Sequence, residues 1–275
     1  PLFAGMGEFH RVITTKDAGA QRYFDQGMVL AFGFNHAESI RSFRAAQKLD
    51  PDCAMCFWGE ALATGPNINV TAKGKAIMST DEQTAAWAAL EKAKAVSASK
   101  PEVERDLIDA LGKRYSETPV EDRTAFDIAY AGALGELVTK YADDDDIAAM
   151  YGEAWMNTMP WNYWSDATTP RPEIAPVIAA LEKTIARSPK HPLALHRYIH
   201  AMEASAAPEK AEAASDTLLT LVPGSGHLVH MPAHIYYRVG RYNDSVQANI
   251  AAAKVDEDYI AQCNAQGFYP AMYYP

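Results

Sequence analysis

The apolar positions along this chain follow the period of α-helices. They recur every three or four residues through most segments, runs that alternate apolar and polar residues are almost absent, and alanine is frequent. The pattern predicts an all-α protein. Beyond a helical pair in residues 23–51, the predicted helices cover residues 53–63, 81–96, 101–115, 123–141, 145–157, 173–188, 193–204, 208–221, 227–239 and 244–263.

Turn residues divide these helices into repeats. Pro189 and Pro223 are 34 residues apart, which is the length of one tetratricopeptide repeat, a helix–turn–helix unit that stacks into a solenoid. Residues 23–51 fit the same template, with Gly27, Phe43, Ala46 and Pro51 at the expected positions. We therefore predict one domain over residues 1–275, a right-handed solenoid with an irregular middle and repeats near residues 20–53, 54–96, 101–141, 145–188, 192–225 and 226–263.

Longer strings carry a narrower resemblance. FNHAESIRSF, DPDCAMCFWGEA, GPNIN, MPWNYW, GHLVHMPAHIYYRVGRY and DEDYIAQC resemble those of a group of bacterial tetratricopeptide-repeat proteins, many of them exported. The resemblance implies the fold and brings no settled reaction. The chain opens at Pro1 without an initiator methionine, as it would after removal of a leader. We expect a periplasmic or secreted protein, with the cytoplasm as the alternative.

Four histidines repeat with the same period. His196 and His200 recur 34 residues later as His230 and His234. The resemblance to tetratricopeptide repeats implies that these positions face the concave groove where such repeats bind their ligands. The same register places further residues on that wall: His227, Glu203 and Arg238.

This arrangement predicts a metal site. Histidines at i and i+4 project from one face of a helix, and such a pair can bind one metal ion. We expect a transition metal ion, copper, zinc or iron, bound by the following histidines: His196, His200, His227, His230 and His234. The two i, i+4 pairs should line one cavity with His227 and Glu203 at its margin, and Glu203 would be a ligand or a general base.

Three functions remain open. The first is a metal-binding protein, including a metalloenzyme with an open coordination position. The second is a scaffold whose groove binds a peptide or small molecule, with the histidines as recognition or structural residues. The third is a metal chaperone or store. A metal site predicts converging imidazole nitrogens, whereas a scaffold predicts contacts scattered along an open groove.

Other residues are weaker candidates. The groove could also include His36, Trp58, Asn67, Asn69 and Tyr237, although packing and helix capping explain most of them equally well. The Cys53-x-x-Cys56 motif is either a redox or metal pair or two small residues packed at a helix start. Acidic residues 143–146 precede a predicted helix, where carboxylates cap and stabilise its N-terminus, so we prefer capping to calcium binding.

Composition excludes several classes of function. The net charge is −10 and no run of lysine or arginine occurs, which argues against a nucleic-acid partner. No apolar stretch approaches the roughly 20 residues of a membrane span. The sequence also contains no phosphate-binding loop, dinucleotide fingerprint or serine–histidine–aspartate order.

Overall fold

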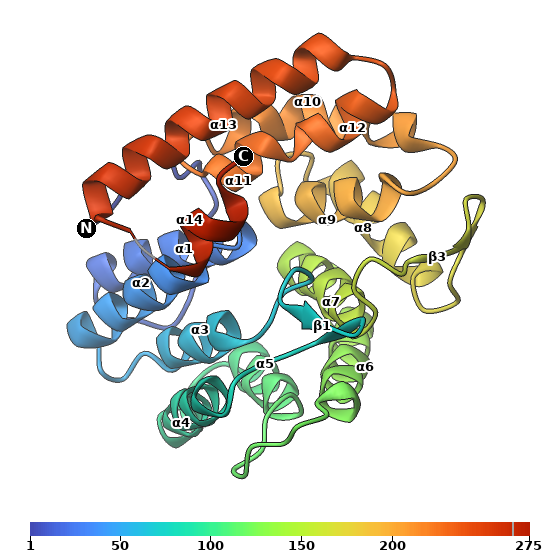
Figure 1. Cartoon of the computed structure of the whole chain (residues 1–275). Helices are drawn as coiled ribbons and strands as arrows, with labels where there is room; N and C mark the ends of the chain where they lie inside the picture. The colour runs from blue at the N-terminus through green and yellow to red at the C-terminus, as the bar shows by residue number, and fades with distance from the viewer. Residues whose placement is uncertain (266) are drawn as a thin grey trace. The chain divides into compact units, whose positions relative to one another are not determined.

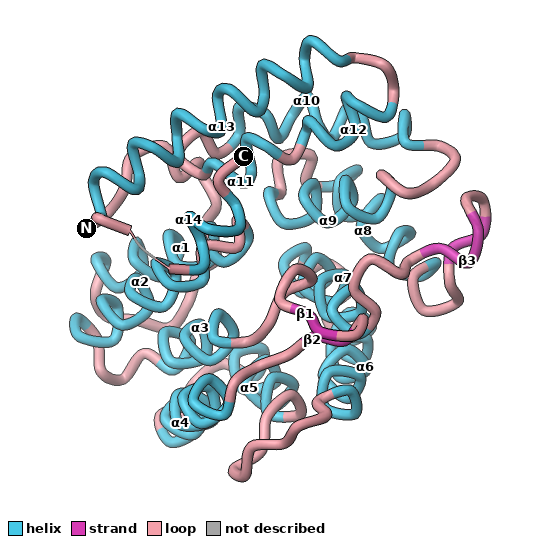
Figure 2. Tube along the Cα trace, in the orientation of Figure 1, coloured by secondary structure: helices cyan, strands magenta, loops and turns pink. Residues whose placement is uncertain are grey.

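The computed structural model describes residues 1–265 and 267–275, and it confirms the all-α class (Figures 1 and 2). Among the described residues, strands form only two short antiparallel hairpins, β1–β2 (Thr71–Ala72 with Lys75–Ala76) and β3–β4 (Trp164–Asp166 with Thr169–Pro170). None of the described helices combines the length and apolar content that a membrane span requires. Contacts group the chain into two compact units, and the single solenoid stays a prediction.

Unit 1 comprises residues 1–2, 10–31 and 36–162. Its helices are α1 (Ala18–Phe32, whose last residue belongs to unit 2), α2 (His36–Leu49), α3 (Ala54–Thr64), α4 (Thr80–Ala95), α5 (Glu102–Gly112), α6 (Thr124–Lys140) and α7 (Asp145–Thr158). Helix α3 packs against α2, α4 and α5, and α6 packs against α7. The elements follow the predicted order, and the hairpin β1–β2 lies between the helices predicted over residues 53–63 and 81–96.

Small residues allow the first helices of unit 1 to pack closely. Phe43 of α2 is fully buried, and a Cβ atom added to Gly27 of α1 would lie 2.8 Å from its ring. A Cβ atom on Gly59 of α3 would also overlap this ring. The absence of a side chain at Gly27 and Gly59 therefore leaves room for the Phe43 ring.

The acidic run before α7 caps that helix, as predicted. Asp144 accepts a hydrogen bond from the backbone N–H of Ile147. Arg11 makes ion pairs with Asp144 at 2.9 Å and with Asp146 at 2.7 Å, so the run binds an arginine of the same unit. This partner supports the preference for capping over calcium binding.

Unit 2 comprises residues 3–9, 32–35 and 163–275. Its helices are α8 (Ala175–Arg187), α9 (Pro192–Met202), a 3-10 turn (Pro208–Ala211), α10 (Glu212–Leu221), α11 (Gly226–His230), α12 (Pro232–Arg238), α13 (Tyr242–Cys263) and α14 (Phe268–Tyr273). Helix α13 packs along α11 and α12, while α10 packs against α9 and α12 (Figure 1). Helix α14 and the hairpin β3–β4 were not predicted.

One predicted helix is divided in two. Residues 227–239 were expected to form a single helix, but α11 ends at His230 and α12 begins at Pro232. Proline has no N–H group to donate to the carbonyl four residues earlier, so the helical hydrogen-bond ladder is interrupted there. His227 and His230 therefore lie on α11, and His234 lies on α12.

Candidate metal centre

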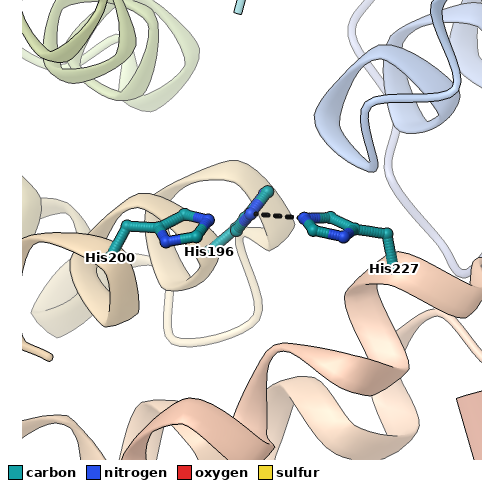
Figure 3. A group of neighbouring side chains, drawn as sticks. All are labelled: His196, His200 and His227. Atoms are coloured by element: carbon teal, nitrogen blue, oxygen red, sulfur yellow. Dashed lines mark hydrogen bonds between the residues drawn. The ribbon is translucent and has the colours of Figure 1, made fainter. Parts of the chain in front are cut away.

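Three histidines of unit 2 form a buried group. His196 and His200 come from α9 and His227 comes from α11, and one imidazole nitrogen of each lies within 4.8 Å of the others (Figure 3). The exposed fractions of the three residues are 0, 1 and 4 %. The sequence placed His227 at the margin of the cavity, but in the structure it belongs to the closest group.

The start of α9 explains how two of these residues are positioned. His191 is the N-cap, and its Nδ1 atom accepts a hydrogen bond from the backbone N–H of Ala194 at 3.2 Å. Pro192 follows at the first helical position, where its fixed φ favours the helix. His196 and His200 are then one turn apart on the same face, with ring centroids separated by 4.8 Å.

Hydrogen bonds fix the tautomers of these two imidazoles. Nδ1 of His196 donates to the backbone carbonyl of Phe32 at 2.7 Å, because that oxygen can only accept. Nδ1 of His200 donates to Oε1 of Glu203 at 2.9 Å. In the neutral state both rings therefore carry their lone pair on Nε2. Anchoring of one ring nitrogen by a carbonyl or carboxylate is the usual arrangement of metal-bound histidines.

A short contact in the group joins His227 to His196. Nε2 of His227 lies 3.2 Å from Nε2 of His196, as the dashed line in Figure 3 shows. Two nitrogen ligands at about 2.0–2.1 Å from one ion, at angles between about 90° and 110°, are roughly 2.9–3.4 Å apart. The pair therefore has the spacing of neighbouring ligands on one ion.

An aromatic residue packs over all three histidines. The ring centroid of Phe34 lies 5.0 Å from that of His196, 6.2 Å from that of His200 and 4.8 Å from that of His227. Phe34 is itself buried and has a φ of 61°, a conformation that is strained for a bulky residue. The guanidinium of the buried Arg197 lies 4.5 Å from the centre of the Phe34 ring.

Burial lowers the pKa values of the three imidazoles and so favours their neutral form. Burial, followed by the charge of Arg197, holds the pKa of His196 well below its usual value. Burial lowers the pKa of His200 to about 4, although the neighbouring Glu203 opposes the shift. The pKa of His227 is also well below its usual value because of burial and the neighbouring histidines. Neutral imidazole is the form that binds metal ions.

A second pair of histidines lies beside this group. Nε2 of His230 and Nε2 of His234 are 3.0 Å apart, and both residues are half-buried. Nδ1 of His234 donates to Oε2 of Glu203 at 2.6 Å. Although burial opposes it, the hydrogen bonds from His200 and His234 lower the pKa of Glu203 to about 2. Glu203 is thus a carboxylate that joins the pair to the buried group.

The remaining candidates lie outside the histidine group. Trp58 is fully buried in unit 1 and donates to the carbonyl of Leu107 at 3.1 Å, which is a packing role. His36 begins α2 and makes a 3.3 Å contact with the amide of Asn67, whose own oxygen accepts from the backbone of Asn69. These four residues belong to unit 1.

Two candidates of unit 2 also point elsewhere. Tyr237 is 65 % exposed and packs edge-on against Tyr242. Arg238 donates to the backbone carbonyl of Ser205 at 3.1 Å. Sequence reasoning missed Phe32, Phe34 and Asn249, which touch the histidines. Only the FGFN segment around Phe34 offered a signal, since a glycine beside aromatic residues is unusual in a helical pattern.

The cysteine pair is a disulfide. Cys53 and Cys56 are joined at the start of α3 in unit 1, and both are fully buried. Cys53 is the N-cap, and its sulfur accepts the backbone N–H of Cys56 at 3.2 Å. The motif is therefore not a pair of thiolates for a metal ion.

Comparison with known proteins does not add to this picture. Neither the protein-family models nor the curated proteins include a match to this chain.

Proposed function

We propose that this protein binds a transition metal ion through Nε2 of His196, His200 and His227. The observation that carries the proposal is the arrangement of the imidazoles: three buried rings meet through one nitrogen each, within 4.8 Å. In two of them the opposite nitrogen is anchored to an oxygen acceptor. Closing the whole group around a tetrahedral ion requires side-chain movements of about 1 Å, since the ligands of such an ion are about 3.4 Å apart.

The donor set limits the identity of the metal. Three neutral imidazoles suit zinc, copper or iron, and the hard ions calcium and magnesium prefer oxygen ligands. Three protein ligands also leave a coordination position for water or a small molecule, as in catalytic zinc sites. A metalloenzyme acting on a small molecule is therefore our leading form of the proposal, and a metal chaperone or store is the form without turnover.

The contacts of Glu203 favour a positioning role over that of a general base. Both of its oxygens accept hydrogen bonds from imidazole Nδ1 atoms. A carboxylate in this position fixes the ring orientation and increases the basicity of the metal-bound nitrogen. We propose this role in place of the metal ligand or general base expected from the sequence.

The scaffold hypothesis receives less support. A recognition surface requires side chains that are open to a partner, whereas these histidines are buried and bonded to one another. A tetratricopeptide-like repeat architecture with the site on its concave wall remains part of our proposal, because His196 and His200 recur 34 residues later as His230 and His234. The buried disulfide of unit 1 supports an oxidising compartment such as the periplasm.

The test is metal analysis of protein purified without an affinity tag. The double variant H196N–H200N removes two Nε2 ligands, while each asparagine retains an N–H donor for Phe32 or Glu203. Wild type should carry the metal, and the variant should lose it with unchanged helicity. H191N is the matched control, since asparagine is also a good N-cap, and it should retain the metal. Equal metal content in all three proteins would contradict the proposal.

A further inference from the structure

In the His230–His234 pair, both Nδ1 atoms must be hydrogen-bond donors. Nδ1 of His234 donates to the Glu203 carboxylate, which can only accept. Nδ1 of His230 contacts Oδ1 of Asn249 at 2.5 Å. The amide nitrogen of Asn249 donates to the carbonyl of Ser245 at 3.0 Å, which fixes the orientation of the amide. His230 must therefore be the donor to Asn249.

With both Nδ1 atoms protonated, each neutral ring has only a lone pair on Nε2. The two Nε2 atoms are 3.0 Å apart, so their lone pairs face each other. Two acceptors at this distance repel unless a positive charge lies between them. A proton would serve, and so would a metal ion, because 3.0 Å lies within the roughly 2.9–3.4 Å expected between neighbouring nitrogen ligands of one ion.

The surroundings of the pair favour a cation. The Glu203 carboxylate contacts His234 directly, at 2.6 Å, and supplies a negative charge. The side chain of His234 is 25 % exposed, so water can complete the coordination of an ion. An ion bound there would lie beside a more exposed side chain than an ion held by the three buried histidines.

We infer that His230 and His234 form a second metal position, which binds a divalent transition metal ion through their Nε2 atoms. This position uses none of the three ligands proposed above. The two positions are neighbours, since the ring centroids of His200 and His234 are 5.6 Å apart and those of His227 and His230 are 5.8 Å apart. Glu203 orients one imidazole of each position and so couples them.

The experiment is a titration of metal-free protein with Zn²⁺ alone, followed by calorimetry and by metal analysis after gel filtration. H230N–H234N removes the two proposed ligands and retains N–H donors for Asn249 and Glu203. Wild type should bind two equivalents of Zn²⁺, and this variant should bind one. H196N–H200N should retain the second equivalent, H191N should bind both, and circular dichroism checks that each protein is folded.

Each other outcome separates the two proposals. One equivalent in wild type that is lost only from H196N–H200N overturns the second position and leaves the proposed function intact. One equivalent that is lost only from H230N–H234N supports the second position and overturns the proposed function. One equivalent that is lost from both variants means that all five imidazoles serve one ion, which overturns the second position.

The shared proton has its own test. Nitrogen-15 spectra of the imidazoles would show whether Nε2 of His230 or His234 carries a proton. The resonance of that proton should disappear when the second equivalent of Zn²⁺ is added. A proton that remains on the pair in excess Zn²⁺ would overturn the inference.

Discussion

His196 and His227 meet through their Nε2 atoms at 3.2 Å although they are 31 residues apart in the chain. The contact between Glu203 and His234 has the same separation. The repeat period of 34 residues would have paired His196 with His230. Facing residues are therefore displaced by about one helical turn from equivalent repeat positions, and this displacement brings His227 into the group.

Replacement of Glu203 by glutamine tests its positioning role. A glutamine side chain has one acceptor and one donor end, so it cannot accept from both His200 and His234 as the carboxylate does. We expect the Zn²⁺ affinity of the protein to fall about 10–100-fold with the fold preserved. The measurement is competition with a chelator of known affinity.

E209Q is the control for this change, because Glu209 is an exposed residue of the same unit and the substitution removes the same charge. It should bind Zn²⁺ as wild type does. A wild-type affinity in E203Q, together with loss of a catalytic activity once one is known, would instead support a general base.

The helical class could be predicted from the sequence, and so could the two helical segments, residues 193–204 and 227–239, in which the five histidines lie. Both predictions were possible because the 3.6-residue period and the 34-residue repeat are local patterns. The end of α11 before Pro232 was not predicted, although a proline within a helical pattern indicates a break. The position of His227 inside the group was not predicted either. The contacts of His196 with the backbone carbonyl of Phe32 and of His230 with Asn249 could not be predicted. Both contacts join distant parts of the chain and depend on tertiary packing.

The stability of the metal-free protein should depend on pH through His200. Its pKa is lowered to about 4 in the folded state, mainly by burial, while the unfolded chain titrates near 6.5. Between these values the unfolded state binds more protons, so stability is complete above about pH 6.5 and falls as the pH drops toward 4. His200 alone would contribute about 3 kcal/mol to this loss, and His196 and His227 act in the same direction.

Asp256 has the opposite effect. Burial raises its pKa to about 6, so its contribution is present at low pH and is lost as the pH rises through 6. Urea unfolding at several pH values between 7.5 and 4.5 should show a shallower loss of stability in H200N than in wild type, and a steeper loss in D256N. Identical slopes in the three proteins would exclude this assignment.

Phe34 should be essential for the packing of the histidine group. The ring is buried and contacts His196, His200 and His227. Truncation of such a residue to alanine typically costs about 3–5 kcal/mol. We expect F34A to lose this amount in urea unfolding. Y237A removes an aromatic ring that is 65 % exposed, and it should change the free energy of unfolding by less than about 0.5 kcal/mol.

The φ of Phe34 offers an internal check on this prediction. At 61° the backbone lies in the left-handed region, where glycine avoids a cost of about 1–2 kcal/mol that other residues pay. F34G should therefore be at least as stable as F34A, the reverse of the usual order. A markedly less stable F34G would show that residue 34 does not adopt this conformation.

The disulfide should be independent of the metal site. Cys53 and Cys56 are bonded and buried in unit 1, whereas Cys263 does not belong to a disulfide. Denatured, unreduced protein should therefore show a single reactive thiol, and reduced protein should show all three.

C53S–C56A retains an N-cap for α3 and removes the crosslink, which for so short a loop contributes about 2 kcal/mol. The variant should lose that stability and keep the full metal content of wild type, because its cysteines and the histidines belong to different units. Loss of metal from C53S–C56A with helicity intact would place the ion at the cysteines and refute the histidine site.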